Sequence, residues 1–211
     1  KKILLIQNKA LELSMFLSIP ASVALVIGSE QIISALFGYG SFTVNSVFNS
    51  SNALYYFGLG LPAFALIKVF STFFFANHDT KTPFYISLVS VLLNILISVY
   101  FFKDIGFIII PIATTISSWF NSLILFIYLK NNNLFEFNKT FFKQFVKIIF
   151  ASIIMGTSFQ YLILLFENQL SYAYIFKSAY LLLCVLFTII FYFAVSYFIK
   201  AFNYQDIKLK Y

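Results

Sequence analysis

The sequence predicts an all-α fold, a polytopic transmembrane helical bundle with six spans. Of its 211 residues, 61% are apolar and only 10% are charged, whereas soluble domains are about half apolar and a quarter charged. Six apolar runs are each long enough to cross a hydrocarbon core of about 30 Å at about 1.5 Å per residue. A bilayer offers the backbone no water, so such spans must be helices. The predicted spans are residues 11–27, 53–76, 84–102, 107–129, 145–166 and 179–199.

The lysines predict the topology of the spans. All fourteen basic residues are lysines, and eleven of them flank spans or occupy loops on one side of the predicted bundle. The other side has only Lys103 and Lys177, and Lys68 lies inside a span. Because cytoplasmic loops carry the excess of Lys and Arg, we expect both ends of the chain and residues 130–140 to be cytoplasmic, and residues 29–52 to be periplasmic. The net charge of +7 flanks spans, so it does not indicate a nucleic-acid partner.

The chain is expected to have two parts. Residues 130–140 are its most polar segment, and they separate four spans that contain polar residues from two that are more uniformly apolar. We therefore predict a four-span unit at residues 1–130, then a cytoplasmic linker and two additional transmembrane helices at residues 131–211. The first residue is not Met, which indicates a fragment of a longer protein.

A short polar corner connects the second and third predicted spans. Asn77 is a plausible end for the earlier helix, since Asn tolerates the left-handed backbone found at such ends. Thr82 is predicted to be the N-cap of the next helix. Pro83 would then be its first residue, because proline lacks the N–H that a first turn leaves unpaired.

No arrangement of residues in the chain predicts catalysis. The only histidine, His78, lies in the polar corner, and the only cysteine, Cys184, lies in the last span. No span contains paired carboxylates, and no glycine-rich phosphate loop opens a helix. We therefore expect a protein that is not an enzyme and has no organic cofactor.

Lys68 is the candidate substrate-binding residue. A charge at mid-span costs roughly 2.5–3.5 kcal/mol on insertion scales, so it normally faces a watery cavity or a partner. One interpretation is a cavity-facing lysine that meets an anionic substrate. The alternative is a lysine that extends to the membrane surface or pairs with a carboxylate outside this chain.

Polar residues in the third and fourth spans form a candidate cation site. Asn94 and Ser98 lie one turn apart on one helix face. Thr114 and the carbonyl of Ile110, next to Pro111, could add oxygens from the following helix. The alternative is a set of hydrogen bonds between helices.

These residues also resemble a known family. Residues 36–43 and the segment Lys68-Val69-Phe70 followed by residues 79–83 resemble the signatures of the MurJ (MviN) family of lipid II flippases. Asn94 and Trp119-Phe120-Asn121 also fall where that family has similar residues. The family belongs to the multidrug/oligosaccharidyl-lipid/polysaccharide exporter superfamily. The resemblance implies helices nine to fourteen of fourteen, the C-terminal part of a two-lobe flippase.

The resemblance carries expectations about function. It implies a fragment of a multi-pass protein of the bacterial inner (plasma) membrane that moves lipid II to the periplasmic leaflet by alternating access. It implies that Lys68 faces a central cavity, and that Asn94, Ile110 and Thr114 match a sodium site in which Ser98 replaces an aspartate. The last two spans would border a groove for the lipid tail. The implied partners are lipid II, membrane lipids and the upstream half of the same protein.

Two alternative functions remain open at this stage. One is another exporter of the same superfamily, for a polysaccharide-lipid or a drug, and the other is a non-transporting membrane scaffold. The upstream sequence would separate them. Several arginines on upstream spans favour lipid II, an acidic and aromatic cavity favours a drug exporter, and uncharged spans favour the scaffold.

Overall fold

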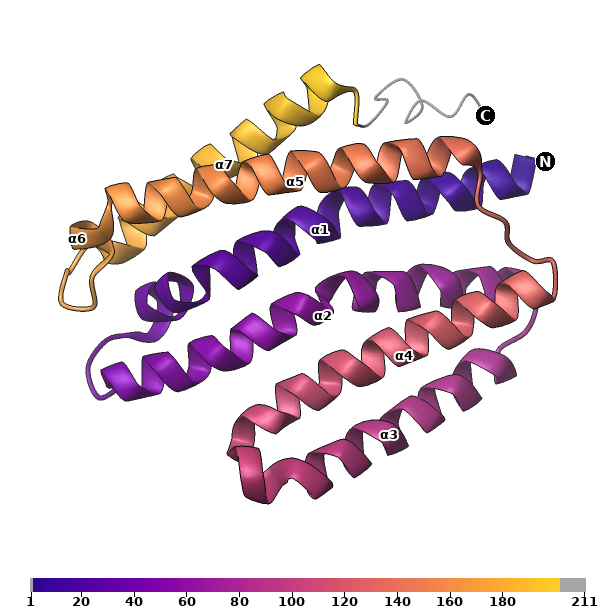
Figure 1. Ribbon diagram of the computed structural model, residues 1–211, viewed down its shortest axis with the longest axis horizontal. Helices are drawn as coiled ribbons and strands as arrows, with labels where there is room; N and C mark the ends of the chain where they lie inside the picture. Colours follow the sequence, from indigo (N-terminus) through magenta and orange to yellow (C-terminus); the bar gives the residue numbers. More distant parts are fainter. Residues whose placement is uncertain (1, 202–211) are drawn as a thin grey trace.

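The computed structural model describes residues 2–201, and these form one fan of helices. The long helices are α1 (Lys2–Phe37), α2 (Val44–Ala76), α3 (Lys81–Ile105), α4 (Ile109–Asn131), α5 (Lys139–Leu165) and α7 (Lys177–Ile199). A 3₁₀ turn, η1 (Gly106–Ile108), joins α3 to α4, and the short α6 (Glu167–Leu170) precedes α7. In space the long helices follow the order α7, α5, α1, α2, α4, α3 (Figure 1).

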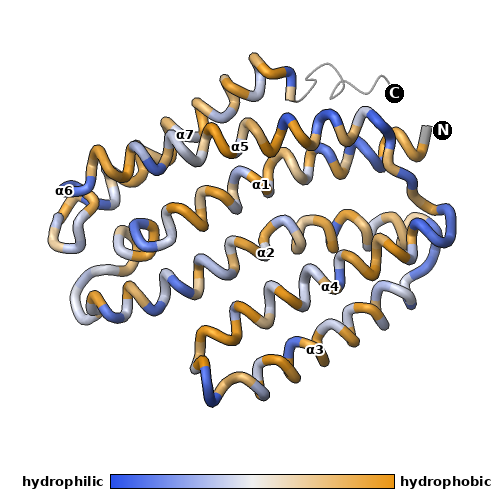
Figure 2. The backbone as a smooth tube through the Cα atoms, viewed as in Figure 1, coloured by the Kyte–Doolittle hydropathy of each residue, from blue (hydrophilic) through white to orange (hydrophobic). Residues whose placement is uncertain are grey.

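The bundle has two ends with different charge. At the end where α1 begins, which we call the lysine-rich end, lie the α2–α3 corner, the α4–α5 loop and the end of α7 (Figure 1). The opposite end has the α1–α2 turn, η1 and the α6–α7 loop, with Lys103 and Lys177 as its lysines among the described residues. Hydrophilic residues gather at both ends, while the helices between them are mostly hydrophobic (Figure 2).

The fold confirms the predicted bundle of spans. Five continuous helical segments within the described residues are long and apolar enough to cross a membrane, and one of them, Lys81–Asn131, has 51 residues. That segment folds back on itself at η1, where Gly106 has a φ of 74°, a conformation that costs glycine little. Because α3 and α4 pack side by side, the described chain makes six crossings.

The first helix is longer than its predicted span. Residues 11–27 were predicted, but α1 runs from Lys2 to Phe37 without a break and includes Pro20. The predicted non-spanning stretch of residues 29–52 therefore shrinks to a turn at residues 38–43. Apolar side chains return along α1 after the polar residues 28–31. Ile33 and Ala35 are buried there, so packing extends the helix past the predicted span.

The polar corner confirms one predicted end and corrects one cap. Helix α2 has its C-cap at Asn77, but the left-handed residue is His78, with φ 60°. Thr82 is not the N-cap, because α3 begins at Lys81. Asp79 takes the capping role: its Oδ1 accepts hydrogen bonds from the backbone N–H of Lys81 at 3.1 Å and of Thr82 at 3.0 Å. Hydrogen bonds from the side chain and the backbone N–H of Thr82 hold the pKa of Asp79 below its usual value of 3.8.

Helix α2 is fastened to its neighbours where Pro62 interrupts its backbone hydrogen bonds. Proline has no N–H, so the carbonyl four residues earlier, that of Gly58, loses its donor. Ser22 of α1 supplies one instead, at 2.7 Å from its Oγ. From α4, Thr115 donates to the carbonyl of Tyr56 at 2.6 Å, and Trp119 donates to that of Leu59 at 3.1 Å. This part of α2 is thus held by both helices beside it.

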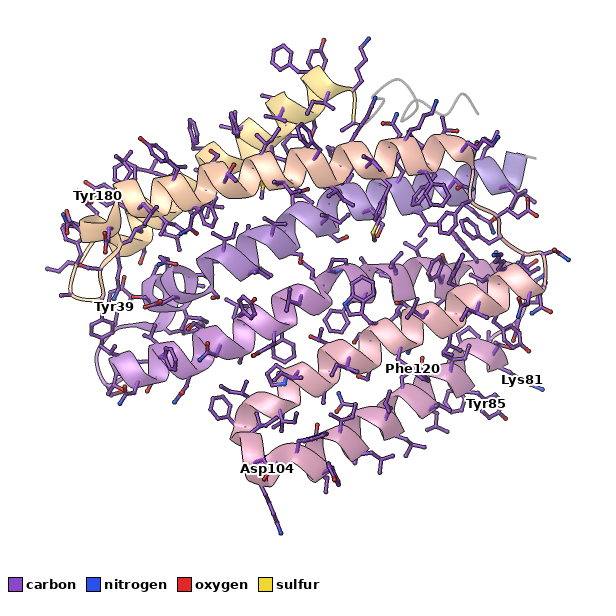
Figure 3. All side chains as sticks on the ribbon, viewed as in Figure 1. Tyr39, Lys81, Tyr85, Asp104, Phe120 and Tyr180 are labelled. Atoms are coloured by element: carbon purple, nitrogen blue, oxygen red, sulfur yellow. The ribbon has the colours of Figure 1, made fainter. Side chains whose placement is uncertain are left out.

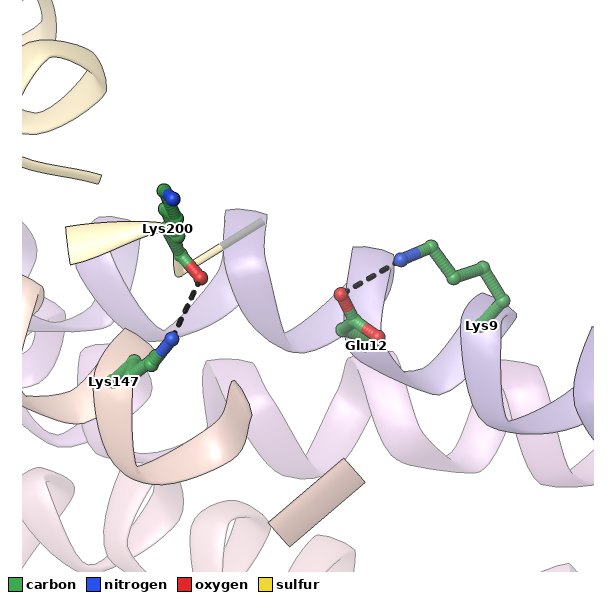
Figure 4. A network of polar contacts seen from close by, with 4 residues as sticks. All are labelled: Lys9, Glu12, Lys147 and Lys200. Atoms are coloured by element: carbon green, nitrogen blue, oxygen red, sulfur yellow. Dashed lines mark hydrogen bonds and ion pairs between the residues drawn. The ribbon is translucent and has the colours of Figure 1, made fainter. Parts of the chain in front are cut away.

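The lysine-rich end is tied together by polar side chains. Asn8 donates to the carbonyl of Glu136 at 2.8 Å and accepts from the N–H of Asn138 at 3.0 Å, which fixes the α4–α5 loop against α1. Lys9 pairs with Glu12 at 2.9 Å (Figure 4). Lys147 donates to the carbonyl of Lys200 at 3.1 Å (Figure 4).

Candidate functional site

Lys68 extends from an exposed strip of α2. Its side chain is exposed, and no described residue forms a hydrogen bond or ion pair with it. It shares its helix face with Phe64 and Phe75, four residues before and seven after it, and both are exposed. Helix α2 ends at Ala76, eight positions after Lys68, so Lys68 lies about 12 Å inside the helix. Apart from the exposed Thr72, this strip is apolar, and the ammonium group on it is available to a partner outside these helices.

A polar cleft opens between α3 and α4. Its volume is about 330 Å³, and seven of its nine lining residues are polar. The lining residues are Ile67, Ser87, Ser90, Val91, Asn94, Thr114, Ser117, Ser118 and Asn121. Asn121 is buried, and its Oδ1 accepts no hydrogen bond from a described group.

The candidate cation residues meet in this cleft, but they bond to one another. Asn94 donates from Nδ2 to the hydroxyls of Thr114 at 3.0 Å and of Ser117 at 3.3 Å. The hydroxyl of Thr114 in turn donates to the carbonyl of Ile110 at 2.8 Å. Ser98 has a buried hydroxyl without a described partner, and it brings no charge.

That donor set does not fit a sodium ion. Hard cations are held by several converging oxygens, usually with a carboxylate among them. Here the amide turns its nitrogen toward the hydroxyls, and the Ile110 carbonyl already accepts a hydrogen bond. No group of three or more His, Cys, Asp or Glu side chains that could hold a metal occurs within residues 2–201. The arrangement joins α3 to α4 by hydrogen bonds.

An apolar cavity of about 460 Å³ lies between α1, α5 and α7. Its wall contains Phe16, Pro20, Ala24, Met155, Phe159 and Ile189, among others. The two hydroxyls in its lining are already used. Thr188 donates to the carbonyl of Cys184 at 2.6 Å, and Tyr192 donates to that of Phe16 at 2.8 Å. The cavity therefore offers a surface suited to hydrocarbon.

The structure brings some predicted site residues together and separates others. Asn94 bonds to Thr114, and Thr114 bonds to the Ile110 carbonyl, whereas Lys68 is not among the residues that line the cleft. Ser87 and Ser90 of the cleft were not predicted, although they lie seven and four residues before Asn94, which places all three on one helix face. Lys177 was assigned to a loop, and the structure buries it.

These features define a multi-span helical membrane protein with an exposed lysine inside α2 that has no described partner, a polar cleft and an apolar cavity. The chain belongs to the family described as lipid II flippase MurJ, whose model matches residues 1–183. A solved structure described as lipid II flippase MurJ in an inward closed conformation superposes with a TM-score of 0.74 and 27% identity, over 97% of this chain and 40% of that chain. The family and this likeness confirm the resemblance seen in the sequence.

Curated relatives agree with the family. A protein of Rickettsia prowazekii named probable lipid II flippase MurJ is 29% identical over 208 residues, which is 95% of this chain and 40% of the relative. One of Rhizobium meliloti with that name is 39% identical over 121 residues, 57% of this chain and 23% of the relative. One of Thermotoga maritima is 35% identical over 144 residues, 68% of this chain and 29% of the relative. The chain thus spans at most about two fifths of these relatives.

Proposed function

We propose that this chain is the C-terminal portion of a lipid II flippase, which moves the lipid-linked peptidoglycan precursor across the bacterial inner membrane by alternating access. The family match over residues 1–183 carries the proposal. The upstream part of the full-length protein supplies the other lobe, and the lysine-rich end faces the cytoplasm because lysine excess marks cytoplasmic loops. Transport by this route makes and breaks no covalent bond, which agrees with the lack of a catalytic arrangement in the sequence.

In this proposal Lys68 binds the anionic headgroup of the substrate. The ammonium stands on a mostly apolar strip without a described partner, and such a charge persists in a membrane when water or an anion meets it. A pyrophosphate offers a strong charge-assisted hydrogen bond. The apolar cavity between α1, α5 and α7 is suited to part of the hydrocarbon tail. The headgroup and tail would therefore meet different parts of this chain.

A sodium ion at Asn94, Ile110 and Thr114 belongs to the proposal only with a carboxylate from the upstream part of the full-length protein. Within this chain those groups act as an interhelical clasp. The mechanism of substrate binding proposed here does not use a sodium ion.

The proposal is tested by growth of a strain depleted of its own lipid II flippase. The full-length protein should restore growth, and Ala21→Trp, which adds a ring to the apolar cavity wall, should impair that rescue. Val99→Trp is the matched control, because Val99 is 71% exposed on α3 and far from the cavity lining. A full-length protein that reaches the membrane and does not restore growth contradicts the proposed function. Equal rescue by both tryptophan variants contradicts the role of the cavity.

A further inference from the structure

Lys177 is a buried cation at the opposite end of the bundle, and the proposed function does not use it. Its side chain is 1% exposed. The ammonium donates to the carbonyls of Gly38 at 2.6 Å and Tyr172 at 2.7 Å. It also lies 4.4 Å from the ring centroid of Tyr39 and 4.5 Å from that of Tyr172. No carboxylate among the described residues pairs with it, so carbonyl dipoles and aromatic faces replace its water.

Those partners come from two segments that are far apart in the sequence. Gly38 and Tyr39 follow α1, and Tyr172 belongs to the α6–α7 loop; Tyr39 and Tyr180 mark this end of the molecule in Figure 3. The ammonium lies so close to Gly38 that a Cβ there would be 3.1 Å from Nζ and 2.5 Å from the Ser34 carbonyl oxygen. The cation is therefore enclosed by the α1–α2 turn on one side and the start of α7 on the other.

Neighbouring hydroxyls reinforce the same junction. The Tyr39 hydroxyl lies 2.6 Å from that of Ser178, and Ser178 donates to the Ala35 carbonyl at 2.7 Å. Tyr172 donates from its hydroxyl to the Phe42 carbonyl at 2.7 Å. With the bond from Lys177 to Gly38, these contacts fasten the beginning of α7 to the end of α1. We call this set of residues the lysine latch.

The latch lies beyond the end of the apolar cavity that is nearer the α1–α2 turn. An apolar cluster, which includes Ala35, Ile163, Leu181 and Cys184, packs α1, α5 and α7 together. Along α7 the order from this end is Lys177, then Leu181 and Cys184, then the cavity residue Ile189. Helix α7 packs mainly on α5 and less extensively on α1, so separation of α7 from the α1–α2 turn would open the α1 side of this cluster and expose Cys184.

We propose that Lys177 is a positioning residue that locks α7 to the α1–α2 turn and thereby keeps the apolar cavity closed at this end. The ammonium is suited to this task because it donates at once to a carbonyl of the α1–α2 turn and to a carbonyl of the α6–α7 loop. The latch constrains the helices whatever substrate the full-length protein carries, so it does not depend on the proposed function.

The native Cys184 reports whether the latch is closed, because it is 3% exposed and lies in the cluster under the latch. The experiment measures the rate at which a maleimide modifies Cys184 in the detergent-purified full-length protein, with any cysteines upstream of this chain replaced by serine. Lys177→Met should raise the rate at least fivefold. Lys103→Met, which changes an exposed lysine at the same end, should leave it unchanged.

A second control separates local opening from general loosening. Ser22→Ala weakens the helix packing at Gly58, away from the latch, and should leave the modification rate of Cys184 unchanged. The proposal is wrong if folded Lys177→Met reacts at the parent rate, or if Lys103→Met or Ser22→Ala accelerates the reaction equally. If Lys177→Met does not accumulate, Tyr172→Leu replaces it and removes one aromatic face. A parent-like rate in Tyr172→Leu overturns the proposal as well.

Discussion

Replacement of Ser22 by alanine should destabilise the protein because Pro62 makes its hydrogen bond necessary. Ser22 is 9% exposed, and its Oγ donates to the carbonyl of Gly58 at 2.7 Å. That carbonyl has no backbone donor, since residue 62 is proline. Hydrogen bonds between membrane helices contribute on average about 0.6 and at most about 1.7 kcal/mol, and a buried carbonyl left unpaired costs about 1–3 kcal/mol. We expect Ser22→Ala to lower the free energy of unfolding by about 1–2 kcal/mol.

The same substitution should cost much less when residue 62 is alanine. In Pro62→Ala the backbone N–H of residue 62 is available to the Gly58 carbonyl, so loss of the serine hydroxyl leaves nothing unpaired. The two substitutions should therefore show a coupling energy of about 1 kcal/mol. Unfolding of the four full-length variants in mixed detergent micelles, followed by circular dichroism, measures it.

Ser152 provides the control for this cycle. It is 1% exposed, and its hydroxyl donates to the carbonyl of Ile148 in its own helix at 2.8 Å. Residue 152 is not proline, so its backbone N–H is also available to that carbonyl. Ser152→Ala should therefore destabilise the protein less than Ser22→Ala and should not couple to Pro62. A coupling energy between Ser22 and Pro62 below about 0.3 kcal/mol, the usual error of additivity, would refute the reasoning.

Three further predictions concern the corner, the topology and the clasp. Asp79→Ala should lower the free energy of unfolding by about 1 kcal/mol at pH 7. The pKa of Asp79 is lowered on folding. The stabilisation by Asp79 is therefore present above the usual carboxyl pKa and is lost as the pH falls through the lowered pKa of the folded protein. A series of chemical unfolding measurements from pH 7 to pH 2 that showed the opposite trend would contradict this. In intact cells, an impermeant thiol reagent should label Asn45→Cys and leave Lys139→Cys unlabelled, and the reverse pattern would overturn the topology. Asn94→Ala should leave any sodium dependence of the full-length protein nearly unchanged in a sodium titration, and a large loss of sodium affinity would show that the clasp binds the ion.

The number of helices could be predicted from the sequence because a bilayer leaves the backbone few choices. Apolar runs of sufficient length must be helical, so six spans followed from composition. The beginning of α1 could not be predicted in this way, because hydrogen bonds between Asn8 and the α4–α5 loop stabilise its first turns. The Asp79 cap was missed because Thr82 before Pro83 matches the usual cap pattern equally well.

Only the residues of the candidate site that local spacing and a short connection bring together could be predicted. The meeting of Asn94 with Thr114 depends on two adjacent antiparallel helices, and the short η1 connection fixes their register. The direction of the Asn94 amide could not be predicted, because it depends on which hydroxyl donates to the Ile110 carbonyl. Lys177 resembled a loop lysine because its carbonyl and aromatic partners, Gly38 and Tyr39, lie about 140 positions earlier in the chain.

The measurement that tests the central claim most directly is complementation of a flippase-depleted strain by full-length variants at Lys68. Lys68→Ala should impair growth while its amount in the membrane stays normal, because the exposed strip of α2 loses the charge proposed to meet the anionic headgroup. Lys68→Arg should retain more function, since the charge remains although its geometry differs. Lys103→Ala, at another exposed lysine, should grow like the parent. Full growth with Lys68→Ala, or failure of Lys68→Arg as severe as that of Lys68→Ala at equal expression, would contradict the account.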